Sequence, residues 1–372
     1  MNSKERHEGR YLRRKQKREE KKRTKTAMYD NFDKVFAWDN LYSSFHRCCL
    51  GVGWKCSTQL YKANAVYNIT TTYNQLHAGT YKSKGFYEFD IIERGKKRHI
   101  KSIHISERVV QKCLCDYSLV PMLTRSFIYD NGACMKGKGI DFALGRLKEH
   151  LHSFYRKYGN DGYVLTFDFS KYFDTINHEI LKREINKKYT DKRIVNLICS
   201  FIDNFGGENG LGLGSQISQI CALFYPNKLD HAIKEKMGIK YYGRYMDDGY
   251  LIHHDKTHLQ KCLRSLKEIC AELGIALNEN KTQIIKMSCY FTFLKKRIKL
   301  TDTGRIVMKI SKKSIRSMRK KLHHFKPLVD NGNFDKADIK TSFVSWLGHV
   351  SKYNSWHTAL RMKELFKQLY GG

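Results

Sequence analysis

The amino-acid sequence predicts an α+β fold built around a short antiparallel sheet. An apolar, β-rich run at residues 162–170 (GYVLTFDFS) predicts one central strand. Two further β-type runs within residues 239–254 flank a short polar turn, which is the pattern of a hairpin. Amphipathic segments before and after these runs have helical spacing, so we expect helices around the sheet.

Length and composition favour a globular chain of enzyme size that binds a polyanion. The 372 residues, with a mass of 43.7 kDa, exceed a minimal binding module and allow two or three subdomains. Hydrophobic residues make up 41% and aromatic residues 13% of the chain, which excludes wholesale disorder. Against 36 acids stand 69 Lys and Arg, a formal net charge of +33 that attracts polyanions. Nucleic acid is therefore the first candidate partner.

Membrane proteins and disulfide scaffolds are not favoured. No stretch approaches the ~20 apolar residues that span a bilayer, and the N-terminus lacks the apolar block of a secretory signal. We therefore expect a cytoplasmic protein without a membrane partner. The 11 cysteines are scattered without CxxC spacing, which indicates reduced, mostly buried thiols and argues against structural zinc.

Residues 1–30 form a basic N-terminal arm. Its first 25 residues contain twelve Lys and Arg against four Glu, with few apolar side chains. Such an arm can track an RNA backbone or bind a partner as a basic helix. It can equally be a disordered end that adds solubility, and both interpretations stay open.

A basic hairpin and two helices are expected between the arm and the sheet. Residues 85–105 alternate apolar and basic side chains, which predicts a hairpin with its turn near residues 93–97. The next segment has helical spacing, with Ser106 as its N-cap. A loop at residues 131–139 then precedes the amphipathic run FALGRLKEHLHSFYRKY, which predicts the second helix.

Three aspartates mark the end of the predicted sheet. Asp168 closes the first apolar strand, and Asp247 and Asp248 stand at the turn of the later hairpin. Alone, each is an ordinary strand-end or turn acid. Together they would meet, and clustered carboxylates repel one another unless cations lie between them. Hard oxygen ligands favour Mg²⁺ or Mn²⁺, and two such ions can clamp an in-line phosphoryl displacement.

These residues belong to a series of motifs that resembles bacterial reverse transcriptases of the group-II-intron-related class. FDFSKYF (167–173) resembles motif A, and YMDD (245–248) resembles motif C. In chain order, residues 93–111 resemble the fingers motifs, and GLGLGSQISQ (210–219), LGIALNENKT (273–282) and FTFLKKRI (291–298) resemble motif B, motif D and the primer-grip hairpin. The resemblance spans residues 85–300 and implies a right-hand polymerase with fingers, a palm with a short antiparallel sheet, and a helical thumb.

The resemblance implies an RNA-directed DNA polymerase that uses two Mg²⁺ ions, for which Mn²⁺ can substitute. Asp168 and Asp247 would bind these ions beside the main chain of Phe169, and Asp248 would complete the catalytic carboxylate cluster. The implied substrates and partners are deoxynucleoside triphosphates, a template RNA and the RNA–DNA duplex. The nucleotide-binding residues expected from the motifs are Lys97, Arg98, Phe169, Lys171, Tyr172, Phe173, Leu213, Gly214, Gln219, Tyr245 and Lys281.

Several of these residues have a distinct expected role. Phe173 would exclude a 2′-hydroxyl and so select deoxynucleotides, although an ordinary core Phe is the plain alternative. Arg98 would pair with the triphosphate, because its guanidinium fork can chelate phosphate oxygens. The main-chain amides of Lys171 and Tyr172 would receive phosphate oxygens, and Lys281 would donate a proton to the leaving pyrophosphate. Lys97 would assist, or it is simply part of a charged hairpin tip.

Motif B departs from the intron-type pattern. Many intron-type enzymes have PQG followed by SP, whereas this chain has Gly212-Leu213-Gly214 and then Ser218-Gln219. This form resembles reverse transcriptases of diversity-generating retroelements, which copy a dedicated noncoding RNA with adenine-directed infidelity and act with a small basic accessory protein. Leu213 lacks the hydrogen-bonding capacity of an amide beside the nascent pair, or it merely packs a helix start. The alternatives are a phage-defence reverse transcriptase with its own noncoding RNA and a non-catalytic RNA-binding scaffold.

The C-terminal segment has the pattern of a helical thumb. Apolar side chains at Ile315, Met318, Leu322 and Phe325 form a helical stripe within a basic face. Two further helices are expected at residues 339–350 and 357–369, with Trp346 and Trp356 as core anchors. The expected domains are the arm (1–30), fingers (31–160), palm (161–308, with the motif B helix at 210–238) and thumb (309–372).

Overall fold

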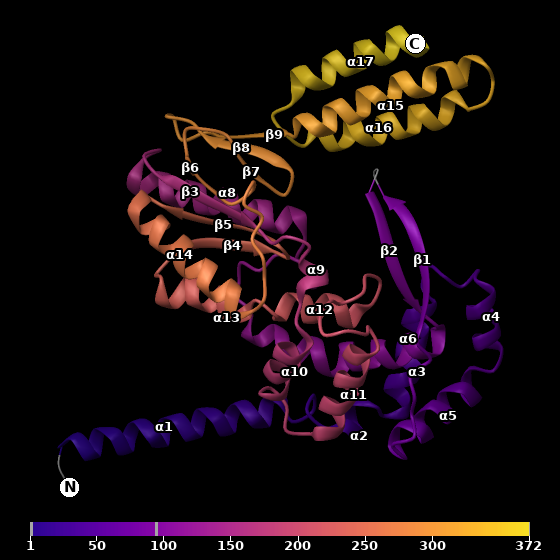
Figure 1. The fold of residues 1–372 in the computed structure, drawn as a ribbon, viewed down its shortest axis with the longest axis vertical. Coiled ribbons are helices and arrows are strands. Elements are labelled where there is room, and N and C mark those ends of the chain that lie inside the picture. Colours follow the sequence, from indigo (N-terminus) through magenta and orange to yellow (C-terminus); the bar gives the residue numbers. More distant parts are fainter. Residues whose placement is uncertain (1–2, 94–95, 372) are drawn as a thin grey trace. The chain divides into compact units, whose positions relative to one another are not determined.

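The computed structural model describes residues 3–93 and 96–371, and the chain divides into two compact units. The first unit consists of Met1–Ile128, Lys171–His231 and Ile269–Ala276, and the second consists of Tyr129–Ser170, Ala232–Glu268 and Leu277–Gly372. Each unit therefore combines segments that lie far apart in the sequence. The expected boundaries of fingers, palm and thumb stay a prediction. Figure 1 labels the elements of both units.

The first unit is mostly helical, with one two-stranded hairpin. Its N-terminal helices are α1 (Ser3–Thr26), α2 (Phe32–Val35), α3 (Trp38–Cys49), α4 (Cys56–Ala63) and α5 (Ala65–His77). The hairpin strands β1 (Phe86–Glu93) and β2 (Lys96–Ile103) lead into α6 (Ile105–Leu114), the π-helix η1 (Cys115–Leu119), α7 (Val120–Leu123) and the 3₁₀ helix η2 (Thr124–Ser126). The later helices are α9 (Tyr172–Thr175), α10 (His178–Asn186), α11 (Lys192–Asp203), α12 (Gln216–Phe224) and α13 (Asn227–His231).

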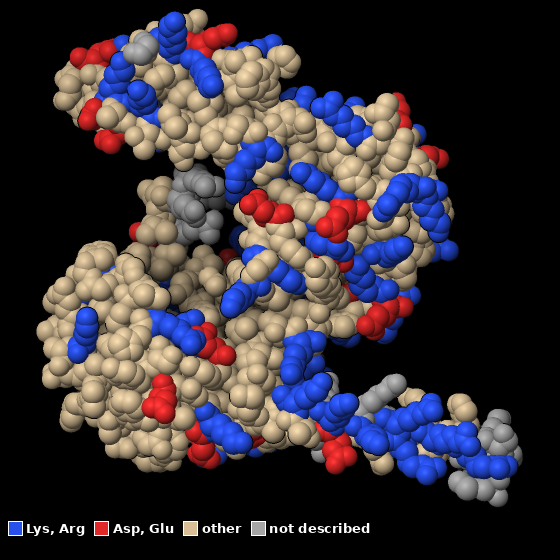
Figure 2. Space-filling view, turned by 180° about the vertical axis from the view of Figure 1, so that it is seen from behind, with Lys and Arg blue, Asp and Glu red and all other residues tan. Residues whose placement is uncertain are grey.

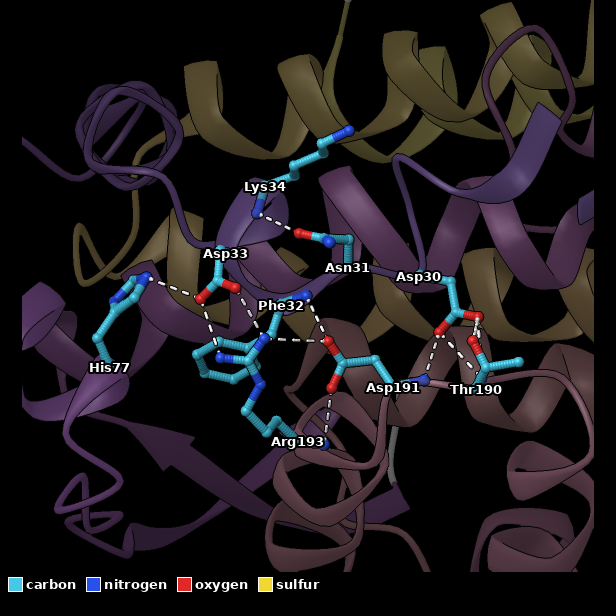
Figure 3. A network of polar contacts seen from close by, with 9 residues as sticks. All are labelled: Asp30, Asn31, Phe32, Asp33, Lys34, His77, Thr190, Asp191 and Arg193. Carbon is cyan, nitrogen blue, oxygen red and sulfur yellow. Dashed lines mark hydrogen bonds and ion pairs between the residues drawn. The ribbon is translucent and has the colours of Figure 1, made fainter. Parts of the chain in front are cut away.

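The basic arm is helical, and polar contacts fix the chain just after it. Figure 2 shows Lys and Arg over much of the visible surface of α1. Asp30 accepts a hydrogen bond from the Asp191 N–H (3.0 Å), and Asp191 accepts one from the Phe32 N–H (2.8 Å). The Arg193 guanidinium donates to both carboxylate oxygens of Asp33, at 2.9 and 2.8 Å, and holds the pKa of Asp33 below its usual value. Residues 30–34 are thereby anchored beside the start of α11 (Figure 3).

The expected basic hairpin forms, but the helix after it begins differently. β1 and β2 pair antiparallel from Phe86↔Ile103 to Glu93↔Lys96, and the two residues of the turn lie outside the described residues. The N-cap of α6 is His104, whose ring accepts a hydrogen bond from the Ser106 N–H at 3.2 Å. The prediction of Ser106 as the cap was therefore wrong, because the imidazole nitrogen supplies the acceptor two residues earlier.

The second unit contains the antiparallel sheet and the C-terminal helices. Its elements are α8 (Ile140–Tyr158), β3 (Tyr163–Asp168), η3 (Ala232–Lys236), β4 (Tyr241–Tyr245), β5 (Asp248–His253), α14 (Lys256–Glu272, assigned to this unit as far as Glu268), β6 (Gln283–Lys286), β7 (Phe291–Phe293), β8 (Lys296–Leu300), β9 (Ile306–Ile310), α15 (Lys312–Asp330), α16 (Lys336–Ser351) and α17 (Trp356–Tyr370). One sheet has the strand order β4-β5-β3-β6, and a second has the order β7-β8-β9.

A single core joins α8 to both sheets of the second unit. Leu147, Leu151 and Phe154 of α8 pack in one cluster with Val164 of β3 and Ile252 of β5. The same cluster takes in the apolar residues of β7, β8 and β9. Side chains alternate along a strand, so this packing covers one face of the four-stranded sheet. The cluster does not include the polar residues at the end of this sheet.

The three C-terminal helices pack on one another as the expected thumb pattern predicts (Figure 1). Met318 and Leu322 of the predicted stripe are buried with Phe343 of α16. Trp346 joins this core, and its indole N–H donates to the Ser314 hydroxyl at 3.1 Å. Trp356 was wrongly expected in the core: at the first position of α17 it is 67% exposed, since that helix turns other residues inward.

The cysteines are unpaired, as the scattered spacing predicts. All 11 cysteines are free thiols, and six of them are buried. Across the part of the chain that the structure describes, no helix is both long and apolar enough to cross a membrane.

Candidate active site

The register of the sheet brings three carboxylates together in the second unit. Asp168, the last residue of β3, lies opposite Asp248, the first residue of β5. Residues opposite each other in an antiparallel pair point to the same face, so both side chains project from one face. Asp247 stands in the turn between β4 and β5, and its carbonyl accepts a hydrogen bond from the Phe169 N–H at 3.0 Å. The sheet therefore places Asp168, Asp247 and Asp248 at one end, and the catalytic role expected of them stays a prediction.

The turn itself differs from the expected one. Tyr245 pairs with Asp248, so the two turn residues are Met246 and Asp247, and Asp248 already belongs to the strand. Met246 has a φ of 56°, a left-handed conformation that costs a residue with a side chain ~1–2 kcal/mol. The expectation that Asp247 and Asp248 both stand at the turn was wrong for Asp248, because the strand pairing extends to Tyr245↔Asp248.

Burial and mutual repulsion raise the pKa values of two aspartates in this cluster. Burial raises the pKa of Asp247, and the charge of Asp168 raises it further. Burial also raises the pKa of Asp248 to about 7, although a hydrogen bond from the Leu294 N–H (3.0 Å) acts in the opposite direction. Clustered acids with raised pKa values favour the binding of a cation, because its charge offsets both the cost of burying the carboxylates and their mutual repulsion.

One cation already lies on the cluster. The Lys281 ammonium contacts both carboxylate oxygens of Asp168, at 2.9 and 2.8 Å. Its backbone is held beside β3, since the Thr166 hydroxyl donates to the Lys281 carbonyl (3.1 Å) and the Asn278 N–H donates to the Asp168 carbonyl (2.8 Å). The Lys281 side chain is 60% exposed whereas that of Asp168 is 11% exposed, so the ammonium covers the carboxylate from the solvent side.

The donor atoms suit a hard divalent cation, but they are not arranged as a ready-made cage. Within residues 3–93 and 96–371, no three or more His, Cys, Asp or Glu side chains form a group that could hold a metal ion. Lys281 contacts the carboxylate of Asp168, and the Leu294 N–H donates to an oxygen of Asp248. Asp168 and Asp247 are the carboxylates that could supply oxygens to Mg²⁺. The part expected of the Phe169 main chain stays a prediction.

A second strained turn lies against the cluster. β7 and β8 pair at Phe293↔Lys296, so Leu294 and Lys295 form a two-residue turn, with φ values of 49° and 61°. Positive φ at both positions is the pattern of a type I′ hairpin, which usually takes Asn-Gly. This turn carries the Leu294 N–H that donates to Asp248, and it lies in the segment that resembles the primer grip.

The other expected nucleotide-binding residues belong mainly to the first unit. Lys171 has a φ of 45° and precedes α9, Tyr172 is buried with its hydroxyl donating to the Ala222 carbonyl (2.6 Å), and Phe173 is half-buried. Lys97 forms an ion pair with Asp90 at 2.8 Å. Tyr245, in the second unit, lies opposite Asp248 and is half-buried.

The motif B loop lies against the hairpin within the first unit. Leu213 forms a β-bridge with Ile100 of β2, and its carbonyl accepts a hydrogen bond from the Lys101 N–H at 3.2 Å. Gly214 has a φ of 115° and lies so close to β2 that a Cβ would be 3.1 Å from the Lys101 carbonyl oxygen. Gln219 is exposed on α12. Arg98 lies in the same strand opposite Ile91, but its side chain lies outside the described residues.

Two contributors were missed from the sequence. The Leu294 main chain offers no sequence signal, because any residue has an N–H. Arg244 does offer one: it is a charged residue within the strand YYGRY, and it is fully buried directly before the YMDD turn. A charge in a buried strand requires a partner, so an arginine within this strand indicates a buried polar contact.

Comparison with known proteins identifies the family of the chain. Residues 82–350 match the family described as reverse transcriptase (RNA-dependent DNA polymerase). The fold is similar to telomerase from Candida albicans in complex with a TWJ fragment of telomeric RNA (12% identity, 75% of this chain and 55% of that chain, TM-score 0.46). It is also similar to apo telomerase from Candida tropicalis truncated from its C-terminal domain (16% identity, 65% and 60% of the chains, TM-score 0.47).

The chain spans less than two thirds of either telomerase chain, and no curated protein matches it. The family match covers well over half of the 372 residues and includes the carboxylate cluster, Lys281 and the motif B loop. The chain therefore belongs to the reverse transcriptase (RNA-dependent DNA polymerase) family.

Proposed function

We propose that nucleotidyl transfer takes place at Asp168, Asp247 and Asp248. The observation that carries the proposal is the register of the sheet, which places Asp168 opposite Asp248 and adds Asp247 from the adjoining turn. Asp168 and Asp247 would hold Mg²⁺, which when bound would activate the primer 3′-hydroxyl and neutralise charge on the triphosphate. The protein itself would hold these oxygens in fixed positions and exclude most of the water around them.

Lys281 would act in two places during this reaction. In the structure its ammonium lies on Asp168, where it offsets the carboxylate charge. A cation that binds Asp168 must displace it, and the exposed side chain is then free to reach the leaving pyrophosphate as a proton donor. This agrees with the role that the motif D resemblance implies.

The proposal assigns nucleotide binding and selection to residues of motif A and of the fingers motifs. Phe173 would exclude a 2′-hydroxyl, and Arg98 would pair with the triphosphate. The main-chain amides of Lys171 and Tyr172 would receive phosphate oxygens. The left-handed Lys171 followed by a helical Tyr172 supports the last role, because this alternation turns successive N–H groups toward one side.

At the biological level we propose a bacterial or phage diversity-generating retroelement. The enzyme would copy a dedicated noncoding RNA into DNA with adenine-directed infidelity, together with a small basic accessory protein. Leu213 supports this assignment: it stands in motif B without an amide side chain, and its backbone bridge to Ile100 fixes it beside the hairpin that carries Arg98. The formal charge of +33 supports RNA as template and as bound partner.

The catalytic assignment is tested by Asp247→Ala on the full chain. With Mg²⁺, a primed RNA and labelled deoxynucleotides, we expect the unaltered protein to extend the primer and Asp247→Ala to extend it at least 1000-fold more slowly, in the order of magnitude known for loss of a central catalytic group. RNA binding should persist in the variant, because the basic surface is unchanged.

Asp161→Ala is the matched control, because Asp161 is an exposed acid a few residues before β3. It should extend the primer at the original rate. Equal extension by Asp247→Ala would remove the catalytic assignment. Sequencing of the RNA and new DNA that co-purify with the protein tests the retroelement assignment, which predicts one dominant noncoding RNA and DNA copies altered at template adenines.

A further inference from the structure

Arg244 is a charged side chain in an unusual place. It lies in β4, has 0% exposure, and is among the largest fully buried side chains of the described residues. Removing a guanidinium from water is costly unless it forms hydrogen bonds in the protein interior. The strand around it is otherwise built from Tyr and Gly, so the charge is not there to fill space.

The register places Arg244 on the face opposite to the carboxylates. Arg244 pairs with Gly249, and Gly249 pairs with Phe167, so these three residues form one row across β4, β5 and β3. The next row is Tyr245, Asp248 and Asp168, and side chains of neighbouring rows point to opposite faces. Arg244 therefore lies behind the catalytic edge, on the side where the Phe167 and Tyr242 rings stack at 6.4 Å.

From this buried position the guanidinium reaches the YMDD turn. Arg244 Nη1 donates to the Met246 carbonyl at 2.8 Å, and that carbonyl belongs to the peptide joining Met246 to Asp247. On the other side of the same aspartate, the Asp247 carbonyl accepts from the Phe169 N–H at 3.0 Å. The peptides before and after Asp247 are thus each held by a separate element.

The turn needs such support. Met246 is held at a φ of 56°, which a residue with a side chain adopts only when its surroundings determine it.

We propose that Arg244 is a positioning residue, which fixes the Met246–Asp247 peptide and thereby holds the Asp247 carboxylate in its metal-binding orientation. The inference depends on the proposed role of Asp247. It assigns Arg244 no contact with substrate: the side chain acts through the turn from the opposite face of the sheet.

The test compares Arg244→Met, which removes charge and hydrogen bonds, with Arg244→Lys, which keeps the charge on a side chain one atom shorter. Misplacing a catalytic group costs about 100-fold in rate, and losing a supporting contact weakens metal affinity by about tenfold. We expect Arg244→Met to lose about 100-fold in kcat with the KM for deoxynucleotides changed less than about threefold. Mn²⁺ binding, followed by electron paramagnetic resonance without substrate, should weaken about tenfold in both variants.

The matched control is Arg146→Met in the same unit, because the Arg146 guanidinium pairs with Asp130 and Glu149. It should lower thermal stability but keep Mn²⁺ affinity per folded molecule. If Arg244→Met does not fold, Arg244→Lys decides: retention of full kcat and full Mn²⁺ affinity overturns the proposal, because charge alone then suffices. Loss of kcat with unchanged Mn²⁺ affinity overturns it too. A failure of the proposed function is distinguishable, since the unaltered protein would then neither bind Mn²⁺ at Asp247 nor extend a primer.

Discussion

Replacing His150 with Gln should remove a defined part of the acid sensitivity of this protein. His150 lies in α8, is buried, and contacts the Tyr250 hydroxyl through Nδ1 at 3.0 Å and the Arg146 guanidinium through Nε2 at 3.3 Å. Nε2 also lies 3.5 Å from a carboxylate oxygen of Asp130, whose charge favours the protonated ring, but burial has the larger, opposite effect on the pKa of His150. A guanidinium can only donate, so the hydrogen bond with Arg146 forms with Nε2 of the neutral ring. Protonation would place a second cation against Arg146.

The size of the effect follows from the pKa of this histidine. Burial lowers the pKa of His150 to about 4, whereas an unfolded histidine titrates near 6.5. Below pH 6.5 the unfolded chain therefore binds a proton that the folded chain does not, and stability falls as the pH falls toward 4. The linkage relation gives a loss of about 2 kcal/mol between pH 7.5 and pH 5.0 from this group.

Urea unfolding at pH 7.5, 6.5, 5.5 and 5.0 measures this loss. The free energy of unfolding of His150→Gln should approach that of the unaltered protein as the pH falls, because glutamine keeps a polar group without titrating. The other histidines cancel in the difference between the two proteins. His152→Gln is the control, since His152 is exposed on the same helix. An equal pH dependence of the unaltered protein and His150→Gln would refute the argument.

Three further substitutions test other parts of the structure. Gly249→Ala would place a Cβ 2.3 Å from Cζ of the buried Phe167 ring, so we expect a loss of about 1–3 kcal/mol in thermal unfolding, and an unchanged melting temperature would contradict the packing. Phe173→Ala should raise incorporation of ribonucleotides relative to deoxynucleotides in primer extension, and unchanged sugar discrimination would discredit the gate. Leu213→Gln should lower misincorporation opposite template adenine in sequenced products, whereas an unchanged error spectrum would remove Leu213 from fidelity.

Sequence patterns predicted the elements whose residues carry a local signal. The hairpin of β1 and β2, helix α8 and the stripe of α15 all follow from spacing alone, because alternation and helical periodicity reflect which side is buried. The position of Asp168 opposite Asp248 agrees with the prediction that acids of two β-rich runs lie together, which the resemblance to motifs A and C supported. These predictions needed no knowledge of distant contacts.

Features set by single contacts were not predictable in this way. Helical spacing predicts Ser106 as the cap of α6, whereas the His104 ring accepts the hydrogen bond from the Ser106 N–H and caps the helix. Motif D marked Lys281, but its two contacts with Asp168 depend on how the segment before β6 is held against β3. The buried Arg244 and the Leu294 N–H depend on the register of strands, which spacing does not specify to one residue.

The carboxylate cluster is held by the main chain more than by side-chain partners, and this has a consequence for cation binding. The carbonyl of Asp168, both peptides at Asp247 and an oxygen of Asp248 all take part in hydrogen bonds with main-chain N–H groups or with the buried Arg244. Met246 and Leu294 are kept in left-handed conformations, at a cost of ~1–2 kcal/mol each, which persists only in rigid surroundings.

Against this fixed frame, Lys281 is the exposed component. Its ammonium can leave Asp168 for water at little cost, whereas the aspartates cannot move apart without breaking the sheet. An incoming divalent cation therefore has to displace only the exposed Lys281 ammonium from Asp168, and the sheet need not rearrange. Lys281→Met should accordingly strengthen Mn²⁺ binding while slowing DNA synthesis, because the variant loses the competing ammonium and the proton donor together. If Mn²⁺ affinity is unchanged, the ion pair does not compete for the metal position.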